Sequence, residues 1–516
     1  MKPNPLLCFS ALLALSTPAV FGQSAEPTES PKPPSLTIYN QNFAVVRDTV
    51  ALDLKAGVNN VRFANTTAHV ETDSVILRDP SGKIALQILE QNYRNDPVSQ
   101  ELLLSLNEGK TIDFQTDLGW GQKKIVQGKI VRSGYTPHGQ SAMQRYGQPY
   151  YQAQMQTANA ASQPIIEVDG KLQFSLPGQP IFPALADDTI LKPTLDWQIR
   201  TAKPAKFDAE LAYVTGGMSW EADYNIIAPE KSDLVDVTGW VTIDNQSGKS
   251  FKDAKIKLMA GDVSKIQRGD ANMRAVSNFS DGWSQLAAAG APVTEKAFDE
   301  YHLYTLERPA TLRDRETKQV EFVRATGVKS QRVYIYDGLK VDQNQWRGNS
   351  MENIRNNENF GTECNTKVAV VREFKNSEAN HLGMPLPKGR VRFYKQDDDG
   401  QPEFTGENTI DHTPKDETLR IFTGNAFDLV GERRRTNWKI DNSAHYADES
   451  FEIKLRNHKK EAVEIRVVEH LYRWYTWEIV KPSEPFVKTA AQVIEFRVQL
   501  QPDEEKTITY TAHYTW

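Results

Sequence analysis

The chain has 516 residues, of which 39% are hydrophobic, 25% are charged and 9% are aromatic. These proportions are ordinary for a folded globular protein, and they exclude a disordered, collagenous or polytopic helical membrane chain. The 61 Lys and Arg residues against 67 Asp and Glu residues give a net charge of −6 without a long block of one sign, which argues against nucleic-acid binding. The length predicts about three or four domains.

Residues 1–22 predict a secretory signal peptide. Lys2 supplies the positive start, the apolar run 6–15 follows it, and Val20 and Gly22 provide compact side chains before a cleavage point. The apolar run is shorter than the ~20 residues that a membrane-spanning helix needs. We therefore expect export to the periplasm, the cell surface or the medium, with no transmembrane segment in the mature chain.

The chain contains two cysteines, Cys8 and Cys364. Cys8 lies within the predicted signal, and the large leucines before it do not match a lipid-attachment site. Cleavage leaves Cys364 alone, so the mature chain has no internal disulfide and no cysteine-rich zinc site. Residues 23–35 are rich in Pro, Ser and Glu, which predicts a flexible leader.

Residues 36–115 predict an N-terminal β domain. Val50, Leu52 and Leu54 alternate with small or charged residues, and the segment 80–82, Pro-Ser-Gly, predicts a turn. Similar turns recur about every ten residues, a spacing that is typical of β-sandwiches and barrels.

Residues 116–194 predict a small β unit with a mobile loop at 133–164. Ile125-Val126 and Ile130-Val131 are its expected strand cores. The loop contains no Leu, Ile, Val or Phe and is rich in Gln, Tyr, Gly and Ala, so it cannot bury a core of its own. A Tyr- and Gln-rich adhesive loop is the functional alternative.

Residues 195–440 predict a central β-sandwich region, with a short helical or linker insertion at 270–300. Residues 441–516 predict a C-terminal immunoglobulin-like β-sandwich, in which alternate apolar residues from Phe451 to Leu455 face one side. The expected fold is therefore all-β and multi-domain, built mainly of stacked immunoglobulin-like β-sandwiches.

Three asparagines support this repetition of sandwiches. Asn245, Asn376 and Asn457 each close a predicted strand and precede a polar turn and a second alternating strand. Asparagine tolerates left-handed backbone angles, which is our reason for expecting it at these turns.

Spaced motifs in the second half of the chain carry a family resemblance. They are Trp220–Tyr224, Gly239–Val241, Ala260–Val263, Glu300–Tyr304, Gly389–Tyr394 and Gly424–Asp428. Together, over residues 195–516, they resemble the secreted bacterial family called domain of unknown function 4139, and more distantly the mucoidy-inhibitor-like proteins that share this domain. The resemblance implies an exported, β-rich protein, and it brings no established activity, cofactor or catalytic residue.

The motifs of known chemistry are incomplete. The segment around Ser219 resembles a nucleophile elbow, but Glu221 replaces its second glycine. The run 397–400, Asp-Asp-Asp-Gly, resembles a calcium loop, but Lys395 takes the first ligand position and a hairpin turn is the simpler interpretation. The charged run 432–435 is too short to bind a polyanion and predicts a solvated strand edge. We predict no catalytic residue, cofactor or metal ligand.

An aromatic segment from His470 to Trp477 is the candidate binding site. Exposed rings stack on sugars and on cations, so Trp474, Tyr475 and Trp477 could form a platform for a glycan or a peptide. The alternative is that alternate members, such as Leu471, fill the core. Trp474 and Tyr475 cannot both do so on a strand with one buried face.

We therefore predict an exported, non-enzymatic cell-envelope protein that binds a partner protein or a surface polysaccharide. The alternative is an envelope hydrolase or transferase whose pair of acids comes together only in the fold. A concave cleft lined by two carboxylates and aromatic residues would favour the enzyme. A flat surface with an aromatic patch would favour the binding protein.

Overall fold

A computed structural model describes residues 32–117, 119, 121–135, 163–183, 189–229, 232–261, 263–265, 293–298, 301–341 and 348–516. The predicted signal peptide lies outside these residues, as do most of the predicted leader and most of the predicted mobile loop. Of the predicted insertion 270–300, the described part is a strand, β16 (Val293–Phe298), which pairs with its neighbour β17 (Tyr301–Leu306).

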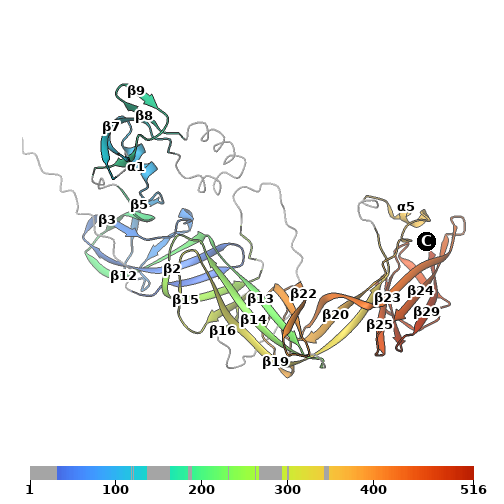
Figure 1. The fold of residues 1–516 in the computed structure, drawn as a ribbon. Helices are drawn as coiled ribbons and strands as arrows, with labels where there is room; N and C mark the ends of the chain where they lie inside the picture. The colour runs from blue at the N-terminus through green and yellow to red at the C-terminus, as the bar shows by residue number, and fades with distance from the viewer. Residues whose placement is uncertain are drawn as a thin grey trace, which may run out of the picture.

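The described chain is mostly β-strand, in sheets of eight, five, three and thirteen strands (Figure 1). Its two described α-helices are short, α1 (Gln100–Leu106) and α5 (Met351–Asn356). This architecture confirms the prediction of an all-β, multi-domain fold.

The eight-stranded sheet joins segments that are far apart in the chain. Besides β16 and β17, it contains β1 (Ser35–Tyr39), β2 (Phe43–Leu54), β4 (Ile76–Arg78), β12 (Ala205–Gly216), β15 (Phe251–Ala260) and β18 (Ala310–Leu312). The three-stranded sheet beside it consists of β3 (Gly57–Ala64), β11 (Thr194–Thr201) and β5 (Gln87–Arg94), and the 3-10 helix η1 spans Thr72–Ser74. Strands β2 and β12 pair along all twelve residues of each, so the segments 36–115 and 195–440 contribute to one hydrophobic core.

The five-stranded sheet has a separate small core. Its strands, in spatial order, are β10 (Gln179–Ile181), β6 (Thr111–Asp117), β7 (Lys123–Arg132), β8 (Ile165–Val168) and β9 (Lys171–Gln173). Ser99 caps the N-terminus of helix α1, because its side chain accepts a hydrogen bond from the Leu102 backbone N–H. Leu104 of this helix packs on Phe114 and Ile166.

The thirteen-stranded sheet occupies most of the second half of the chain. Its strands are β13 (Met218–Ala228), β14 (Leu234–Asn245), β19 (Glu316–Asp337), β20 (Lys367–Lys375), β21 (Gly389–Gln396), β22 (Pro402–Ile410), β23 (Thr418–Asp441), β24 (Tyr446–Asn457), β25 (Val463–His470), β26 (Thr476–Val480), β27 (Phe486–Ala490), β28 (Val493–Leu500) and β29 (Glu505–Thr515). The 3-10 helix η2 spans Glu378–Asn380.

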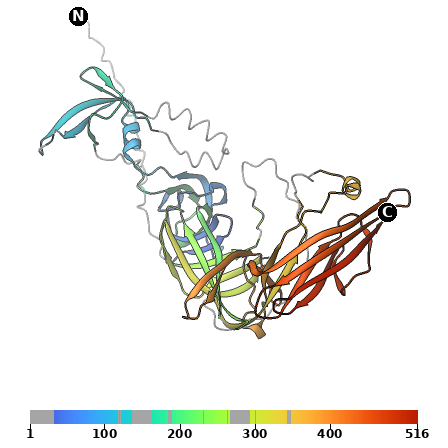
Figure 2. The same ribbon diagram turned by 45° about the vertical axis from the view of Figure 1, so that its right-hand side comes forward.

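Two long strands, β19 and β23, belong to both large cores. Phe322 near the start of β19 lies in the first core, whereas Tyr336 near its end lies in the C-terminal core. Ile421 and Leu429 divide β23 in the same way. We call the part of the molecule around the first core the central body, and the part around the C-terminal core the C-terminal body. Figures 1 and 2 show these strands running from the central body into the C-terminal body. The predicted domain limits stay predictions, but the C-terminal core includes residues that precede 441.

The three asparagines hold turns through their side chains. Asn245, Asn376 and Asn457 are fully buried, and none has a positive φ, so left-handed backbone geometry is the wrong reason for their presence. Each Nδ2 donates to two backbone carbonyls at 2.8–2.9 Å: Lys249 and Arg313 for Asn245, Met384 and Pro414 for Asn376, and Glu461 and Gln501 for Asn457. At each turn the buried amide group donates hydrogen bonds to backbone carbonyls that would otherwise lack a partner. This role explains why asparagine occurs at all three turns.

Candidate functional site

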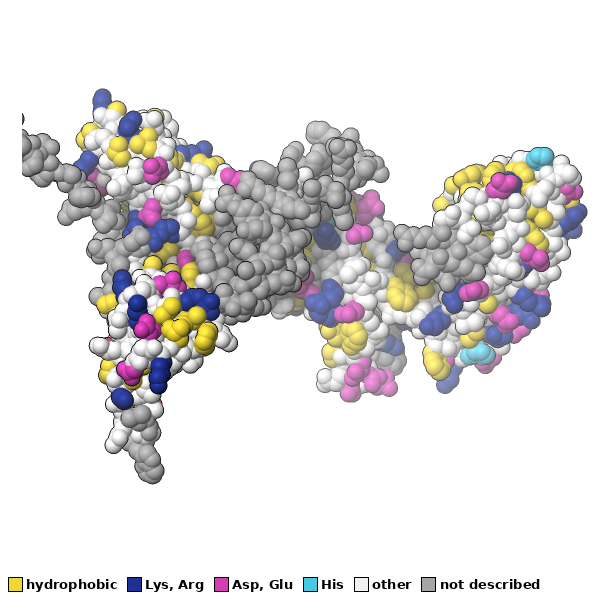
Figure 3. Space-filling view, turned by 90° about the horizontal axis from the view of Figure 1, so that it is seen from above, with side chains coloured by type: hydrophobic (Ala, Val, Ile, Leu, Met, Phe, Trp, Pro, Cys, Tyr) yellow, Lys and Arg dark blue, Asp and Glu magenta, His cyan; other side chains and the backbone are white. Residues whose placement is uncertain are grey.

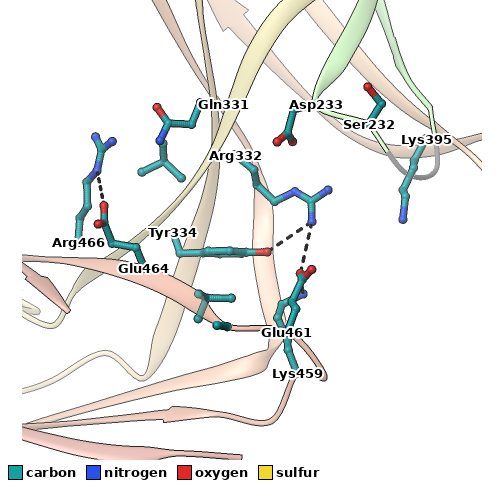
Figure 4. A pocket seen from close by; sticks show the side chains of 13 residues that line it. Ser232, Asp233, Gln331, Arg332, Tyr334, Lys395, Lys459, Glu461, Glu464 and Arg466 are labelled. Carbon is teal, nitrogen blue, oxygen red and sulfur yellow. Dashed lines mark hydrogen bonds and ion pairs between the residues drawn. The ribbon is translucent and has the colours of Figure 1, made fainter. Parts of the chain in front are cut away.

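A cleft of about 640 Å³ opens where β19 passes from the first core to the C-terminal core (Figure 4). This volume falls within the roughly 300–1,000 Å³ of ordinary ligand sites. The lining residues come from four separate segments of the chain. They are Ser232 and Asp233; Gln331, Arg332, Val333 and Tyr334; Lys395; and Lys459, Glu461, Ala462, Val463, Glu464 and Arg466.

Strand β19 places its side chains on two sides of this cleft. Successive side chains of a strand point to opposite faces, so Gln331 and Val333 share one side and Arg332 and Tyr334 share the other. Figure 4 shows Gln331 and Arg466 toward one end of the cleft and Lys395 toward the other.

The carboxylates of the cleft are held by cations. Each has a basic group within 4.0 Å: Asp233 pairs with Arg372 (3.1 Å), and Glu464 pairs with Arg466 (3.9 Å). Glu461 pairs with both Lys459 (3.9 Å) and Arg332 (4.0 Å). These carboxylates already contact cations of the chain. The arrangement therefore suits the binding of a charged ligand better than the transfer of a proton.

Positive charge exceeds negative charge on one side of the cleft. Burial lowers the pKa of Arg372, and the nearby Arg332 guanidinium lowers it further. The Lys459 ammonium lies 5.5 Å from the centre of the Tyr334 ring, and Arg332 donates to the Tyr334 hydroxyl at 3.5 Å. Lys395 is exposed and has no ion-pair partner in the described part of the chain. These groups can receive an anionic group of a ligand.

The cleft lies within the part of the chain that matches a family model. Residues 209–516, more than half of the chain, match the family model described as "Domain of unknown function (DUF4139)". The chain belongs to this family. The match confirms the predicted membership of this family, whereas the more distant resemblance to mucoidy-inhibitor-like proteins stays a prediction. No curated protein and no solved structure matches the chain.

The surface of the described residues carries mixed charge. On the face drawn in Figure 3, Lys and Arg side chains are interspersed with Asp and Glu side chains. No described helix is both long enough and apolar enough to cross a bilayer. The described residues also contain no group of three or more His, Cys, Asp or Glu side chains placed to hold a metal ion.

Most of the predicted aromatic segment of the DUF4139 region, residues 471–475, is a loop between two strands, and Trp477 lies on the second strand. Strand β25 ends at His470 and β26 begins at Thr476, so strand alternation does not govern the residues between them. Leu471 fills the C-terminal core, whereas Tyr475 is 66% exposed. The cleft lies at the start of β25 and this loop follows its end, so the two are separate sites.

The two predicted tryptophans are each half-buried and in contact with cations. Trp474 lies 4.8 Å from the Arg355 guanidinium. Trp477 lies 4.8 Å from the Lys488 ammonium, and its Nε1 donates to the Ala491 carbonyl at 3.1 Å. A ring that is already covered by a cation on one face offers less surface to a ligand, so Tyr475 is the most accessible of the three predicted binding residues. Their role in binding stays a prediction.

The charged run 432–435 has a strand partner on one edge only in the described chain, but only part of the run is solvated. Strand β24 pairs with these residues on one edge, whereas the pairing with β20 on the other edge ends at Val430. Glu432 and Arg434 are exposed, but Arg433 is buried beneath the chain that follows α5. Its Nε donates to both carboxylate oxygens of Glu469, at 3.0 and 2.9 Å, and its Nη1 donates to the Gly361 carbonyl. Burial by itself lowers the pKa of Arg433, but Glu469, Tyr510 and Tyr472 together outweigh burial and the net pKa is raised.

A second buried pair lies beside the first. Arg473 donates to Glu449 at 2.7 Å, and both side chains are almost completely buried. Arg473 also donates to the carbonyls of Ile354 and Asn357, which lie at the C-terminal end of α5. Carbonyls at a helix end have no partner within the helix, so a guanidinium stabilises them. Glu449 and Glu469 therefore stabilise the fold, and their burial keeps a substrate from reaching them.

Neither the cleft nor the buried pairs has a local sequence signal. The cleft depends on the parallel pairing of Tyr334 with Ile465, which are far apart in the chain. Lys459 and Glu461 alone indicate an ordinary polar turn. A search for charged residues next to the predicted starts of strands would have included them, but among many others.

Proposed function

We propose that this chain is an exported, non-enzymatic cell-envelope protein that binds a charged segment of a partner protein or a surface polysaccharide. The single observation that carries the binding role is the polar cleft along β19, with ion-paired carboxylates and the unpaired Lys395. Such a site recognises a ligand by charge and hydrogen bonds, since few apolar groups line it.

The position of the cleft supports a binding role. Arg332 lies on a strand shared by both large cores, Lys395 comes from the central body, and Lys459 comes from the C-terminal body. A ligand anion that contacts all three bridges the two bodies. Export is supported by the sequence of residues 1–22 alone, and fractionation of cells that produce a C-terminally tagged chain tests it directly.

The test compares two double variants of the mature chain. Lys395→Glu with Lys459→Glu reverses charge in the cleft, whereas Lys252→Glu with Lys255→Glu makes the same change at exposed positions of β15, which does not line the cleft. Each immobilised protein is exposed to solubilised envelope material, and the retained components are quantified.

We expect the wild type and the β15 variant to retain the same component, and the cleft variant to retain at least ten-fold less. Circular dichroism and urea unfolding confirm that all three proteins are folded. Equal retention by the two variants, or no retained component at all, would contradict the proposal.

A hydrolase or transferase is the second candidate, because the cleft contains three carboxylates and the aromatic Tyr334. Turnover of purified envelope polysaccharide by the wild type, abolished by Glu461→Gln, would establish this alternative. Unchanged polysaccharide after long incubation with the folded wild type would leave the binding role as the better account.

A further inference from the structure

The floor of the cleft is a gap in the thirteen-stranded sheet. On one edge of β19, β14 pairs as far as Lys329, and β25 begins to pair at Tyr334. Between them, the Asp233 carbonyl accepts a hydrogen bond from the Ser330 backbone N–H. The next three residues, Gln331 to Val333, have no strand partner on this edge within the described chain, although β20 pairs with them on the other edge.

The gap is open to solvent. Gln331, Arg332 and Val333 all line the cleft, so its roughly 640 Å³ lie against this short edge. An unpaired strand edge presents backbone N–H and C=O groups that pair readily with another chain, and proteins normally protect such edges. At ~3.3 Å per residue, the distance along β19 from Ser330 to Tyr334 is about 13 Å, which accommodates roughly three residues of extended chain.

We propose that the cleft binds an extended, acidic peptide segment of a partner protein, which adds a short strand to β19 at residues 331–333. This proposal rests on the proposed binding function and names the class of ligand. Pairing of backbone groups supplies affinity, and side chains at alternate positions of the peptide supply specificity.

Charge determines which side chains the peptide needs. On the side of Arg332, the peptide meets Lys395 and Lys459, and Lys395 has no competing partner in the described chain. A Glu side chain that points to this side gains a cation, whereas a Lys side chain would face like charge. On the other side, Gln331 and Val333 provide no free charge, and small polar side chains fit there.

The backbone edge favours a peptide over a polysaccharide. Only a polypeptide carries N–H and C=O groups at the regular spacing that a strand edge requires. An acidic polysaccharide could still reach the lysines, but it would leave the edge without a strand. The two ligand classes therefore differ in their dependence on backbone donors.

The test uses a fluorescent nine-residue peptide of alternating Thr and Glu, with both ends capped. Two further peptides carry N-methyl groups, either on every Thr or on every Glu, and each modification removes the backbone donors along one edge of an extended chain. Fluorescence anisotropy with the mature protein measures binding at low salt, where charge interactions are strong. Oligogalacturonate serves as an acidic competitor without peptide groups.

We expect the unmodified peptide to bind, one N-methylated peptide to bind at least ten-fold more weakly, and the other to bind nearly as well. The Lys395→Glu, Lys459→Glu variant should lose binding, and the variant of Lys252 and Lys255 should retain it. Equal binding of all three peptides would overturn strand pairing. Binding of oligogalacturonate without the peptide would overturn the peptide proposal and keep the proposed function, whereas absence of binding to peptide, oligogalacturonate and envelope material would contradict both.

Discussion

Buried arginines determine how the C-terminal body holds the chain that follows α5. The Arg433 and Arg473 side chains are almost completely inaccessible, and each is paired with one glutamate and with backbone carbonyls of residues 354–361. Removing two charges from water costs several kcal/mol, which the pairing offsets only if the hydrogen bonds are complete. Loss of one partner therefore costs more than the pair itself contributes.

At this scale we predict a large effect of Glu469→Ala. The substitution leaves the Arg433 guanidinium buried without its carboxylate, which should lower the free energy of unfolding by about 3–5 kcal/mol. Urea unfolding followed by tryptophan fluorescence measures the change. The control is Arg434→Ala on the same strand, since Arg434 is 66% exposed and pairs with Glu452 at the surface.

Surface pairs contribute about 1 kcal/mol or less, so the control should remain close to the wild type. Similar losses for Glu469→Ala and Arg434→Ala would show that the buried pair has no special energetic weight.

At the scale of elements, the long strands β19 and β23 meet inside the C-terminal core. Gly431 of β23 lies against the Tyr336 ring of β19, and a Cβ atom at position 431 would lie 2.2 Å from Tyr336 Cε2. The Tyr336 hydroxyl donates to the Asn365 carbonyl at 2.7 Å, which limits movement of the ring. The contact requires glycine because no side chain fits between the two strands.

We predict that Gly431→Ala lowers the free energy of unfolding by about 1–3 kcal/mol through overpacking. A smaller side chain at position 336 should relieve the clash. The double variant Gly431→Ala, Tyr336→Leu should therefore lose less stability than the sum of the two single variants, as measured by urea unfolding. Simple additivity would contradict a direct clash between the two residues.

On the scale of the whole molecule, the cores differ in whether one continuous segment of the chain supplies all their residues. The small core around Phe114 and Ile166, with the residues packed against it, comes from the segment 104–182. The C-terminal core instead requires Tyr334, Tyr336 and Leu429, which precede residue 441. Burial of apolar surface is the main favourable contribution to folding, so a fragment without these residues lacks part of its stability.

We predict that the fragment 97–183 folds alone, whereas the fragment 441–516 does not. The second fragment lacks the ends of β19 and β23 and exposes the apolar residues that they cover. Circular dichroism and urea titration of both fragments should give a cooperative transition for the first and none for the second. A cooperative transition of 441–516 would contradict the dependence of this core on β19.

The class of fold is predictable from the sequence because strand alternation is a local property. Phe451, Ile453 and Leu455 alternate with charged residues, and all three are buried as their spacing indicates. Leu471 likewise fills the core. The spaced motifs identify the family, because their residues can be compared one position at a time.

Only the tertiary structure determines the cleft along β19. It needs Arg332 of β19, Lys395 of β21 and Lys459 of the turn between β24 and β25 to come together, and it needs the edge of β19 to remain unpaired between β14 and β25. Alternation indicates which face a residue occupies but not which strand lies beside it. Likewise, the sequence around Arg433 resembles an exposed strand, because its partner Glu469 lies on another strand. Each residue's neighbours along the chain determine its strand, whereas contacts between distant segments determine where a strand edge stays open and which charges are buried.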